Sequence, residues 1–260
     1  MRIAFASLAL VLVAWCAPAL AQKPVNPENL QIGLSTDVVY IRADFTGADL
    51  TIFGALENVD PLVARQGRYD VIVVLEGPAR PVVVRRKDRI LGMWINTQSE
   101  TFVNVPVSYS IATTRMLQDI AEPKTFRQLS LGADSIYLQP EEQDDPVTLD
   151  EFTDALRERK KATGLWNLRA GGVQFLSQNL FRASVRLARD VPVGTHKARA
   201  FLFKNGVFIK ETSAPLAIVK SGFEQSISNF SREYSFLYGV AAVLIAILIG
   251  WGGSLVFRRE

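Results

Sequence analysis

The longest uninterrupted apolar stretch of the chain runs from Tyr238 to Phe257 and contains no charged residue. An α-helix rises about 1.5 Å per residue, so a stretch of this length crosses the roughly 30 Å of hydrocarbon in a bilayer. Arg258 and Arg259 follow directly, and the positive-inside rule places such residues in the cytoplasm. The pattern predicts a transmembrane helix at 238–257, a cytoplasmic tail at 258–260, and the rest of the chain on the other side of the membrane.

Small residues recur at every fourth position of this apolar stretch. They are Ala242, Ala246, Gly250 and Ser254. Small residues at this spacing allow a second helix to approach closely. The stripe therefore predicts a helix-packing face, although Gly and Ala are also common in membrane helices without any such role.

The first 21 residues have the pattern of a secretory signal peptide. Arg2 supplies the positive start, Ile3 to Ala14 is apolar, and Ala19-Leu20-Ala21 matches a cleavage site. The mature chain is then expected to begin at Gln22. Cleavage would also remove Cys16, the one cysteine of the sequence, so disulfides and cysteine-based metal or catalytic sites are excluded from the mature chain.

Between these apolar segments the pattern changes to short runs rich in β-branched residues, separated by Gly and Pro, which is typical of antiparallel β-structure. The predicted strands are Leu34–Ile41, Leu50–Leu56, Tyr69–Leu75, Val82–Arg86, Ile90–Ile95, Thr101–Ile111, Val173–Leu176, Leu180–Leu187, Thr195–Lys204 and Val207–Val219. The run Tyr69–Leu75 is continuously apolar after Asp70, which predicts burial on both faces. Hairpin turns are expected at Lys87-Asp88 and at Asn205-Gly206.

The middle of the chain has a helical pattern. Thr113–Ile120 and Asp150–Thr163 are predicted helices, and Thr148 with Glu151 has the spacing of a capping box. The fold class that follows is mainly β: an Ig-like antiparallel β-sandwich over residues 22–221, with a helical insertion at about 112–170 and a C-terminal transmembrane helix. Two small β domains are the alternative. The single sandwich is favoured because 173–220 yields too few strands for an independent one.

Residues 222–237 are predicted to form a juxtamembrane helix that continues into the span. Phe223, Ile227, Phe230 and Tyr234 lie on one stripe of such a helix. This stripe would rest on the bilayer or pack under the β domain.

The formal charge of the chain is nearly balanced, with 29 Lys and Arg against 26 Asp and Glu. Arg2, Arg258 and Arg259 lie outside the expected exported part, which is therefore closer still to neutrality. A balanced surface does not attract polyanions strongly. The sequence therefore predicts no nucleic-acid partner.

No group of residues has the pattern of a catalytic or metal site. His196 is the one histidine, so a histidine triad or a multi-histidine metal site is excluded, and the residue is expected to be half-exposed on a strand. Glu141, Glu142, Asp144 and Asp145 could ligate a hard cation, but they lack the residue order of a calcium loop. We therefore expect no enzyme activity, no cofactor and no metal.

The densest basic cluster is Arg85, Arg86 and Arg89, which precedes an apolar run with Trp94 and Asn96. Arg and Trp are frequent at binding hot spots, so this segment is the candidate ligand or partner site. The structural alternative is a charged hairpin tip with Trp94 in the core.

Several segments together resemble a family of alphaproteobacterial transmembrane proteins. They are GLS at 33–35, DFTG at 44–47, IFGA at 52–55, YDVIVVLEGP at 69–78, RRKDRILGMWIN at 85–96, VPVGTH at 191–196, VKSGFE at 219–224 and the terminal LYG, GW and FRR. The resemblance covers almost the whole mature chain. It implies a location in the bacterial inner membrane with the bulk in the periplasm, and a transporter as a conceivable partner. It brings no catalytic residues.

Three functions remain open from the sequence. The favoured one is a non-enzymatic, membrane-anchored periplasmic protein that binds, assembles or regulates a partner membrane protein while held in the lipid bilayer. The second is a periplasmic domain that binds a small anion through Arg85, Arg86 and Arg89. The third is an envelope enzyme whose carboxylates the sequence does not reveal.

Overall fold

The computed structural model describes residues 27–142, 145–221 and 231–257, with side chains described up to Gly252. The expected signal peptide at 1–21 and the tail at 258–260 lie outside these residues. So do Phe223, Ile227 and Phe230 of the predicted juxtamembrane stripe, and Asp144 of the acidic loop.

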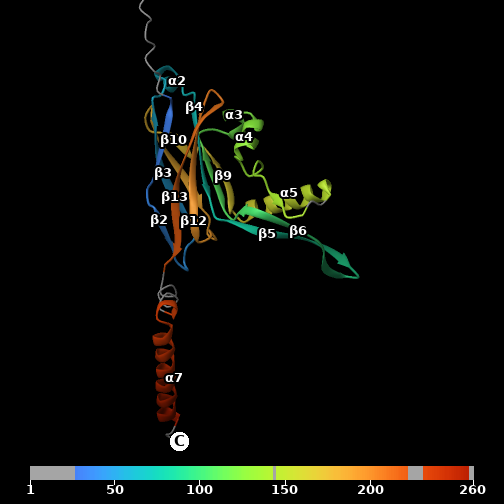
Figure 1. Cartoon of the computed structure of the whole chain (residues 1–260), viewed down its shortest axis with the longest axis vertical. Helices are drawn as coiled ribbons and strands as arrows, with labels where there is room; N and C mark the ends of the chain where they lie inside the picture. Colours follow the sequence, from blue (N-terminus) through green and yellow to red (C-terminus); the bar gives the residue numbers. More distant parts are fainter. Residues whose placement is uncertain (1–26, 143–144, 222–230, 258–260) are drawn as a thin grey trace, which may run out of the picture.

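Two sheets form the body of the molecule (Figure 1). The first sheet has the strand order β1 (Asn29–Leu34), β3 (Ala48–Glu57), β11 (Leu180–Leu187), β10 (Val173–Phe175). The second has the order β2 (Val38–Ile41), β13 (Val207–Lys220), β12 (Gly194–Lys204), β4 (Tyr69–Glu76), β7 (Tyr109–Thr113), β9 (Trp166–Ala170). The pairs are antiparallel except at the two edges of the second sheet, where β2 pairs with β13 and β9 pairs with β7 in parallel.

The centre of the second sheet is buried on both faces, and β4 shows why. Val71 and Val73 point into the core between the two sheets, whereas Ile72 and Val74 point into a second core on the other side. Side chains alternate between the faces of a strand, so a strand covered on both sides needs a continuous apolar run. The prediction of two buried faces for Tyr69–Leu75 is confirmed.

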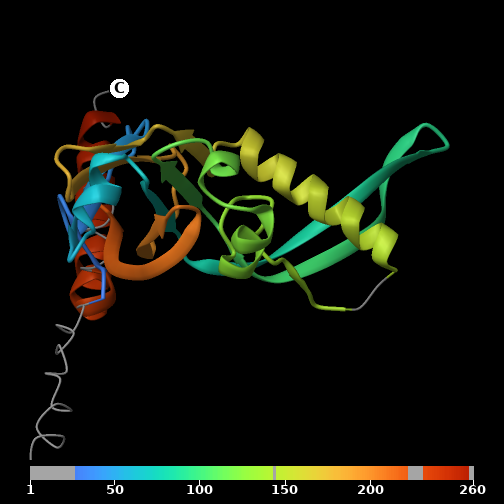
Figure 2. The same ribbon diagram turned by 90° about the horizontal axis from the view of Figure 1, so that it is seen from above.

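The second core is covered by helices from the segment between β7 and β9 (Figure 2). They are α3 (Leu117–Ile120), α4 (Pro123–Leu129) and α5 (Pro146–Ala162). Helix α5 buries Phe152 and Leu156, which lie four residues apart on one face. It begins at Pro146 after Asp145, without a side-chain cap, so the capping box predicted at Thr148 and Glu151 is wrong. A further short helix, α2 (Pro61–Arg65), precedes β4.

A third sheet leaves the body as a long hairpin, which we call the arm. It consists of β5 (Ala79–Ile90) and β6 (Met93–Pro106), joined near its base by the short strand β8 (Gln139–Pro140). The arm extends well beyond the sandwich and beyond the end of α5 (Figures 1 and 2).

The two predicted hairpin turns have different outcomes. Asn205 and Gly206 link β12 to β13 with φ of 51° and 82°, as expected for a two-residue turn that needs positive φ. Lys87 and Asp88 are not a turn, because both lie within β5 and pair with Asn96 and Ile95. The chain instead turns four residues later.

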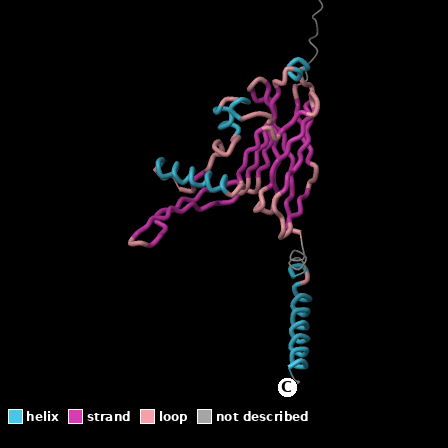
Figure 3. Tube along the Cα trace, turned by 180° about the vertical axis from the view of Figure 1, so that it is seen from behind, coloured by secondary structure: helices cyan, strands magenta, loops and turns pink. Residues whose placement is uncertain are grey.

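The apolar C-terminal segment forms helix α7 (Ser235–Phe257), which stands apart from the sheets (Figure 3). Its window Ser235–Gly252 has a mean hydropathy of 2.1, and none of it is buried within the chain. The predicted fold class is confirmed: a mainly β, Ig-like sandwich with a helical insertion and a C-terminal apolar helix.

Candidate functional site: the hairpin arm

The base of the arm is fixed by backbone hydrogen bonds where the chain leaves and re-enters the second sheet. The amide of Gly77 donates to the carbonyl of Ser108 over 2.8 Å, and the amide of Val107 donates to the carbonyl of Pro78 over 3.1 Å. A Cβ at Gly77 would lie 2.3 Å from Oγ of Ser108, which is too close for any other residue without rearrangement. The arm is therefore held by a closely packed base.

Helix α5 braces the middle of the arm. Arg86 forms an ion pair with Glu151 and donates to Oε1 of Gln98 over 3.0 Å. Its guanidinium carbon lies 6.0 Å from the centre of the Phe152 ring. These contacts join β5 both to its partner strand and to the helix.

Beyond this brace the arm buries nothing within the described residues. All residues from Arg85 to Ser99 are exposed. Five large apolar side chains are among them: Ile90, Leu91, Met93, Trp94 and Ile95. We call the segment from Lys87 to Asn96 the arm tip. Apolar patches of this kind on a protein surface mark binding sites.

The pairing of the strands places these residues on the two faces of the ribbon. Directly paired residues share a face, and the face alternates along each strand. Arg89 pairs with Trp94 and Lys87 with Asn96, so these four residues lie on one face. Ile90 pairs with Met93 and Asp88 with Ile95, which places the other apolar side chains on the opposite face.

The turn at the end of the arm is Leu91-Gly92. Both residues have positive φ, 50° and 85°, as the two central positions of a tight hairpin turn require. Glycine adopts this conformation freely, but leucine does so at a cost of roughly 1–2 kcal/mol. Leu91 is 95 % exposed, so no packing against the described residues offsets this cost.

The structure places four of the five residues predicted for this site on one face of the ribbon. They are Arg85, Arg89, Trp94 and Asn96, whereas Arg86 is engaged by α5. Arg85 and Arg86 are neighbours on a strand and point to opposite faces. The alternative that placed Trp94 in the core is wrong, since its side chain is 68 % exposed.

Sequence reasoning missed Leu91 and the neighbouring apolar residues as site residues. The pattern predicts a strand at Ile90–Ile95, and an apolar strand is normally buried. Two features of the sequence could have revealed them. Four of the five residues at 85–89 are basic, and the run that follows at 90–95 contains no polar side chain.

The predicted packing face of the C-terminal helix lies on α7. Ala242, Ala246 and Gly250 are exposed, and a Cβ at Gly250 would meet no atom within 4 Å. The side chain of Ser254 lies outside the described residues. Among the described residues, nothing covers this face.

His196 is buried, contrary to the prediction of a half-exposed residue. It is 1 % exposed, with Nδ1 3.2 Å from the carbonyl of Gly194. Burial lowers its pKa, and the hydrogen bond to Gly194 opposes this in part. The residue lies under the base of the arm, where Gly77 leaves room for it.

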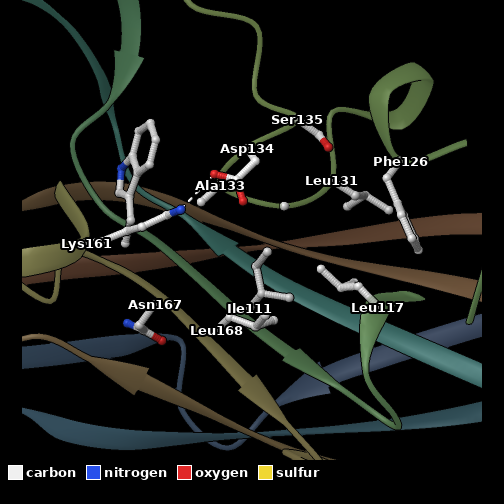
Figure 4. Close-up of a pocket in the computed structure, with 12 residues that line it drawn as sticks. Ile111, Leu117, Phe126, Leu131, Ala133, Asp134, Ser135, Lys161, Asn167 and Leu168 are labelled. Atoms are coloured by element: carbon white, nitrogen blue, oxygen red, sulfur yellow. Dashed lines mark hydrogen bonds and ion pairs between the residues drawn. The ribbon is translucent and has the colours of Figure 1, made fainter. Parts of the chain in front are cut away.

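A cavity of about 210 Å³ lies between the helical insertion and the edge of the second sheet (Figure 4). Its apolar lining includes Ile111, Phe126 and Trp166. Asp134 is the one carboxylate among its lining residues, and Nζ of Lys161 donates to it over 2.7 Å. The cavity thus offers apolar space and one internally neutralised ion pair.

Within the described part of the chain, no three His, Cys, Asp or Glu side chains are grouped so as to hold a metal ion. Glu141, Glu142 and Asp145 of the acidic loop belong to this part. Asp144 does not.

The sandwich and the exposed apolar helix define the class: a β-sandwich protein with one segment long and apolar enough to cross a membrane. The chain belongs to the family described as "Putative transmembrane protein (Alph_Pro_TM)", whose model matches residues 29–259. The resemblance seen in the sequence is thereby confirmed, and the protein is a membrane protein of this family.

A search of curated proteins finds no match. Among solved structures, the chain is similar to AggA, the major subunit of aggregative adherence fimbriae type I from Escherichia coli. The identity is 9 %, the match covers 76 % of this chain and 97 % of AggA, and the TM-score is 0.27. A TM-score this low carries no functional argument.

Proposed function

We propose that this protein is a non-enzymatic periplasmic binding module, anchored in the bacterial inner membrane, that binds or assembles a partner membrane protein. The observation that carries the proposal is the arm, whose residues from Arg85 to Ser99 are all exposed. The inner part of the arm contributes Phe102 and Val105 to the second core, but the outer part adds nothing to it. An outer part that exposes large apolar side chains fits a binding role better than a structural one.

The way the arm is built supports this role. Its base is fixed by the hydrogen bonds at Gly77 and Val107, and its middle is held by the ion pair of Arg86 with Glu151. A preorganised element loses little conformational entropy when it binds. The outer residues of the arm can therefore bind with a small loss of conformational entropy.

Helix α7 supplies the anchor and a second contact. The arginines at 258 and 259 favour a cytoplasmic C-terminus by the positive-inside rule, which leaves the sandwich in the periplasm. The exposed face of Ala242, Ala246 and Gly250 suits close packing against a helix of the partner. A polytopic protein such as a transporter would offer both a helix and a periplasmic surface.

The other two functions have weaker support. Binding of a small anion by the three arginines requires them to converge, but Arg85 and Arg86 point to opposite faces and Arg86 is paired with Glu151. A hydrolase that uses paired acids requires two carboxylates in a cleft. In the cavity beside the helical insertion, Asp134 is the one carboxylate, and Lys161 neutralises it. Two larger pockets are each lined by two acids, Asp119 with Glu122 and Glu28 with Asp60. In the second of these, Glu28 already accepts hydrogen bonds from Tyr69 and Lys204.

The proposal is tested by crosslinking in living cells. A photoreactive amino acid is placed at Ser99 on the arm, at Ala246 on α7 and, as a control, at Gln66, an exposed residue that caps α2. We expect the same membrane protein to be captured from Ser99 and Ala246 but not from Gln66. Self-adducts alone, or no adduct at either position, would contradict a partner membrane protein.

A further inference from the structure

We propose that the arm tip inserts into the headgroup layer of a lipid bilayer that contains anionic lipids, as a second membrane attachment beside α7. This goes beyond the proposed function, because it requires only this chain and lipid.

The distribution of apolar side chains favours lipid over a protein surface. Trp94 lies on one face of the ribbon, Ile90, Met93 and Ile95 lie on the other, and Leu91 projects from the end. A protein surface that meets a ribbon from one side covers one face only. A bilayer surrounds an inserted tip on all sides and buries every one of these side chains.

The charge of the tip is complementary to anionic headgroups. Lys87 and Arg89 lie on the face of Trp94, with Arg85 further along β5. The one acid of the tip, Asp88, already accepts a hydrogen bond from Thr97. Basic residues behind an apolar, tryptophan-bearing end form the combination that binds membrane interfaces, where indole rings settle at headgroup depth.

The strained turn points to the same role. Leu91 holds a positive φ that Asn or Gly would adopt more easily, and among the residues that the structure describes it is the most exposed large apolar one. Strain without internal compensation indicates a functional demand on the residue. Insertion supplies that compensation by burying the leucine.

The arm and the anchor leave the sandwich at the same end. Glu76, the last residue of β4 before the arm, pairs with Lys197, and Gly194 of the same strand β12 pairs with Ile218 near the end of β13. The arm therefore starts where the chain departs toward α7, and its tip lies level with that end of the sandwich (Figure 1). From the brace at Arg86, the tip reaches about 17 Å further at 3.3 Å per residue. This geometry suits contact with the bilayer that α7 crosses.

The insertion must be shallow. Beyond the base, the outer edges of β5 and β6 have no partner strand among the described residues, since β8 pairs with β6 only at Phe102 and Val103. Unpaired amide and carbonyl groups are costly in hydrocarbon, so these edges must remain within reach of water. The expected depth is the interface, where the apolar side chains enter and the backbone stays hydrated.

The test uses the full chain with Cys16→Ser and one new thiol, either Leu91→Cys or Met93→Cys, labelled with the fluorophore NBD. Gln66→Cys, at the opposite end of the sandwich, is the matched control. Each protein is reconstituted into vesicles of phosphatidylcholine, with or without phosphatidylglycerol, that carry a lipid with a nitroxide near its headgroup. At Leu91 and Met93 we expect the emission to shift to the blue and most of it to be lost by nitroxide quenching. Both effects should be larger in the vesicles with phosphatidylglycerol. At Gln66 we expect neither effect.

Three results would overturn the proposal. The first is emission at Leu91 and Met93 as water-exposed as at Gln66 in both vesicles. The second is a blue shift without nitroxide quenching, which would show burial against a second copy of the chain. The third is quenching that is equal with and without phosphatidylglycerol, or equal in the original chain and in a Lys87→Glu, Arg89→Glu variant. Either result would show that insertion does not depend on anionic headgroups. None of them bears on a partner protein, which the crosslinking in cells tests separately.

Discussion

Nε2 of His196 lies 3.3 Å from Oγ of Ser108, inside the base of the arm. A Cβ at Gly77 would be 2.3 Å from that hydroxyl and 3.1 Å from that ring nitrogen. The three residues come from β12, from the connection of β6 to β7 and from the connection of β4 to β5. The histidine therefore lies where the arm joins the second sheet.

This position makes stability depend on pH. Burial lowers the pKa of His196 in the folded chain, whereas the unfolded value is about 6.5. As the pH falls below about 6.5, the unfolded state binds a proton that the folded state resists, so the free energy of unfolding decreases. We expect this decrease between pH 7.5 and 5 in denaturant titrations, and a flatter profile in His196→Gln. Equal slopes for the two proteins would contradict the assignment.

Arg115 is expected to stabilise the start of β4 through Asp70. The carboxylate is 2 % exposed, and it accepts hydrogen bonds from Nε of Arg115 at 2.9 Å and from Thr114 at 2.7 Å. Replacing Arg115 with Met leaves a buried carboxylate with fewer partners, at a cost of roughly 1.5–3 kcal/mol. Chemical denaturation measures this cost. The matched control, Arg65→Met on exposed α2, should change the unfolding free energy by less than about 0.5 kcal/mol.

Removing the arm tip should leave the sandwich intact. When residues 87–97 are replaced by Asn-Gly, Arg86 and Gln98 still pair next to a two-residue turn. Because the removed residues are all exposed, the free energy of unfolding should change by less than about 1 kcal/mol. With the photoreactive residue at Ala246 instead, this variant should capture less of the partner membrane protein in cells. Loss of cooperative unfolding would show instead that the tip is part of the folded core.

Leu91→Asn separates stability from binding at a single residue. Asparagine tolerates positive φ better than leucine, so the turn should be as stable as before or more stable by up to about 1 kcal/mol. The same change removes the most exposed apolar side chain. We expect weaker nitroxide quenching of a label at Met93, with a thermal unfolding midpoint that is unchanged or higher. Unchanged quenching would show that Leu91 is dispensable for insertion.

A fragment of residues 22–111 should not fold by itself. It contains β1 to β6 and most of β7, but it lacks β12, which lies between β4 and β13 at the centre of the second sheet, and β11, which pairs with β3. Without them the apolar residues of β4 lose their neighbours in both cores. Circular dichroism should show no cooperative thermal transition. A cooperative transition would favour two independent β domains.

Much of the fold follows from local patterns in the sequence. The apolar length of 238–257 predicted α7, Asn205-Gly206 predicted the turn between β12 and β13, and the continuous apolar run of 69–75 predicted a strand covered on both sides. Each of these signals depends on neighbouring residues alone: the length of a segment, the φ angles that a turn requires, or the alternation of side chains along a strand.

The arm could not be predicted in the same way. The run Ile90–Ile95 is apolar, and locally nothing distinguishes an apolar strand that the core covers from one that projects beyond it. The position of α5 determines which part of the arm is exposed. The helix contacts the arm as far as Arg86, and the arm residues beyond Arg86 are uncovered. The same holds for His196, whose burial depends on Gly77 and Ser108, residues more than eighty positions away. The sequence by itself determined the membrane segment and the mainly β fold, whereas the tertiary structure alone decided which apolar residues face water, because burial depends on contacts between distant segments.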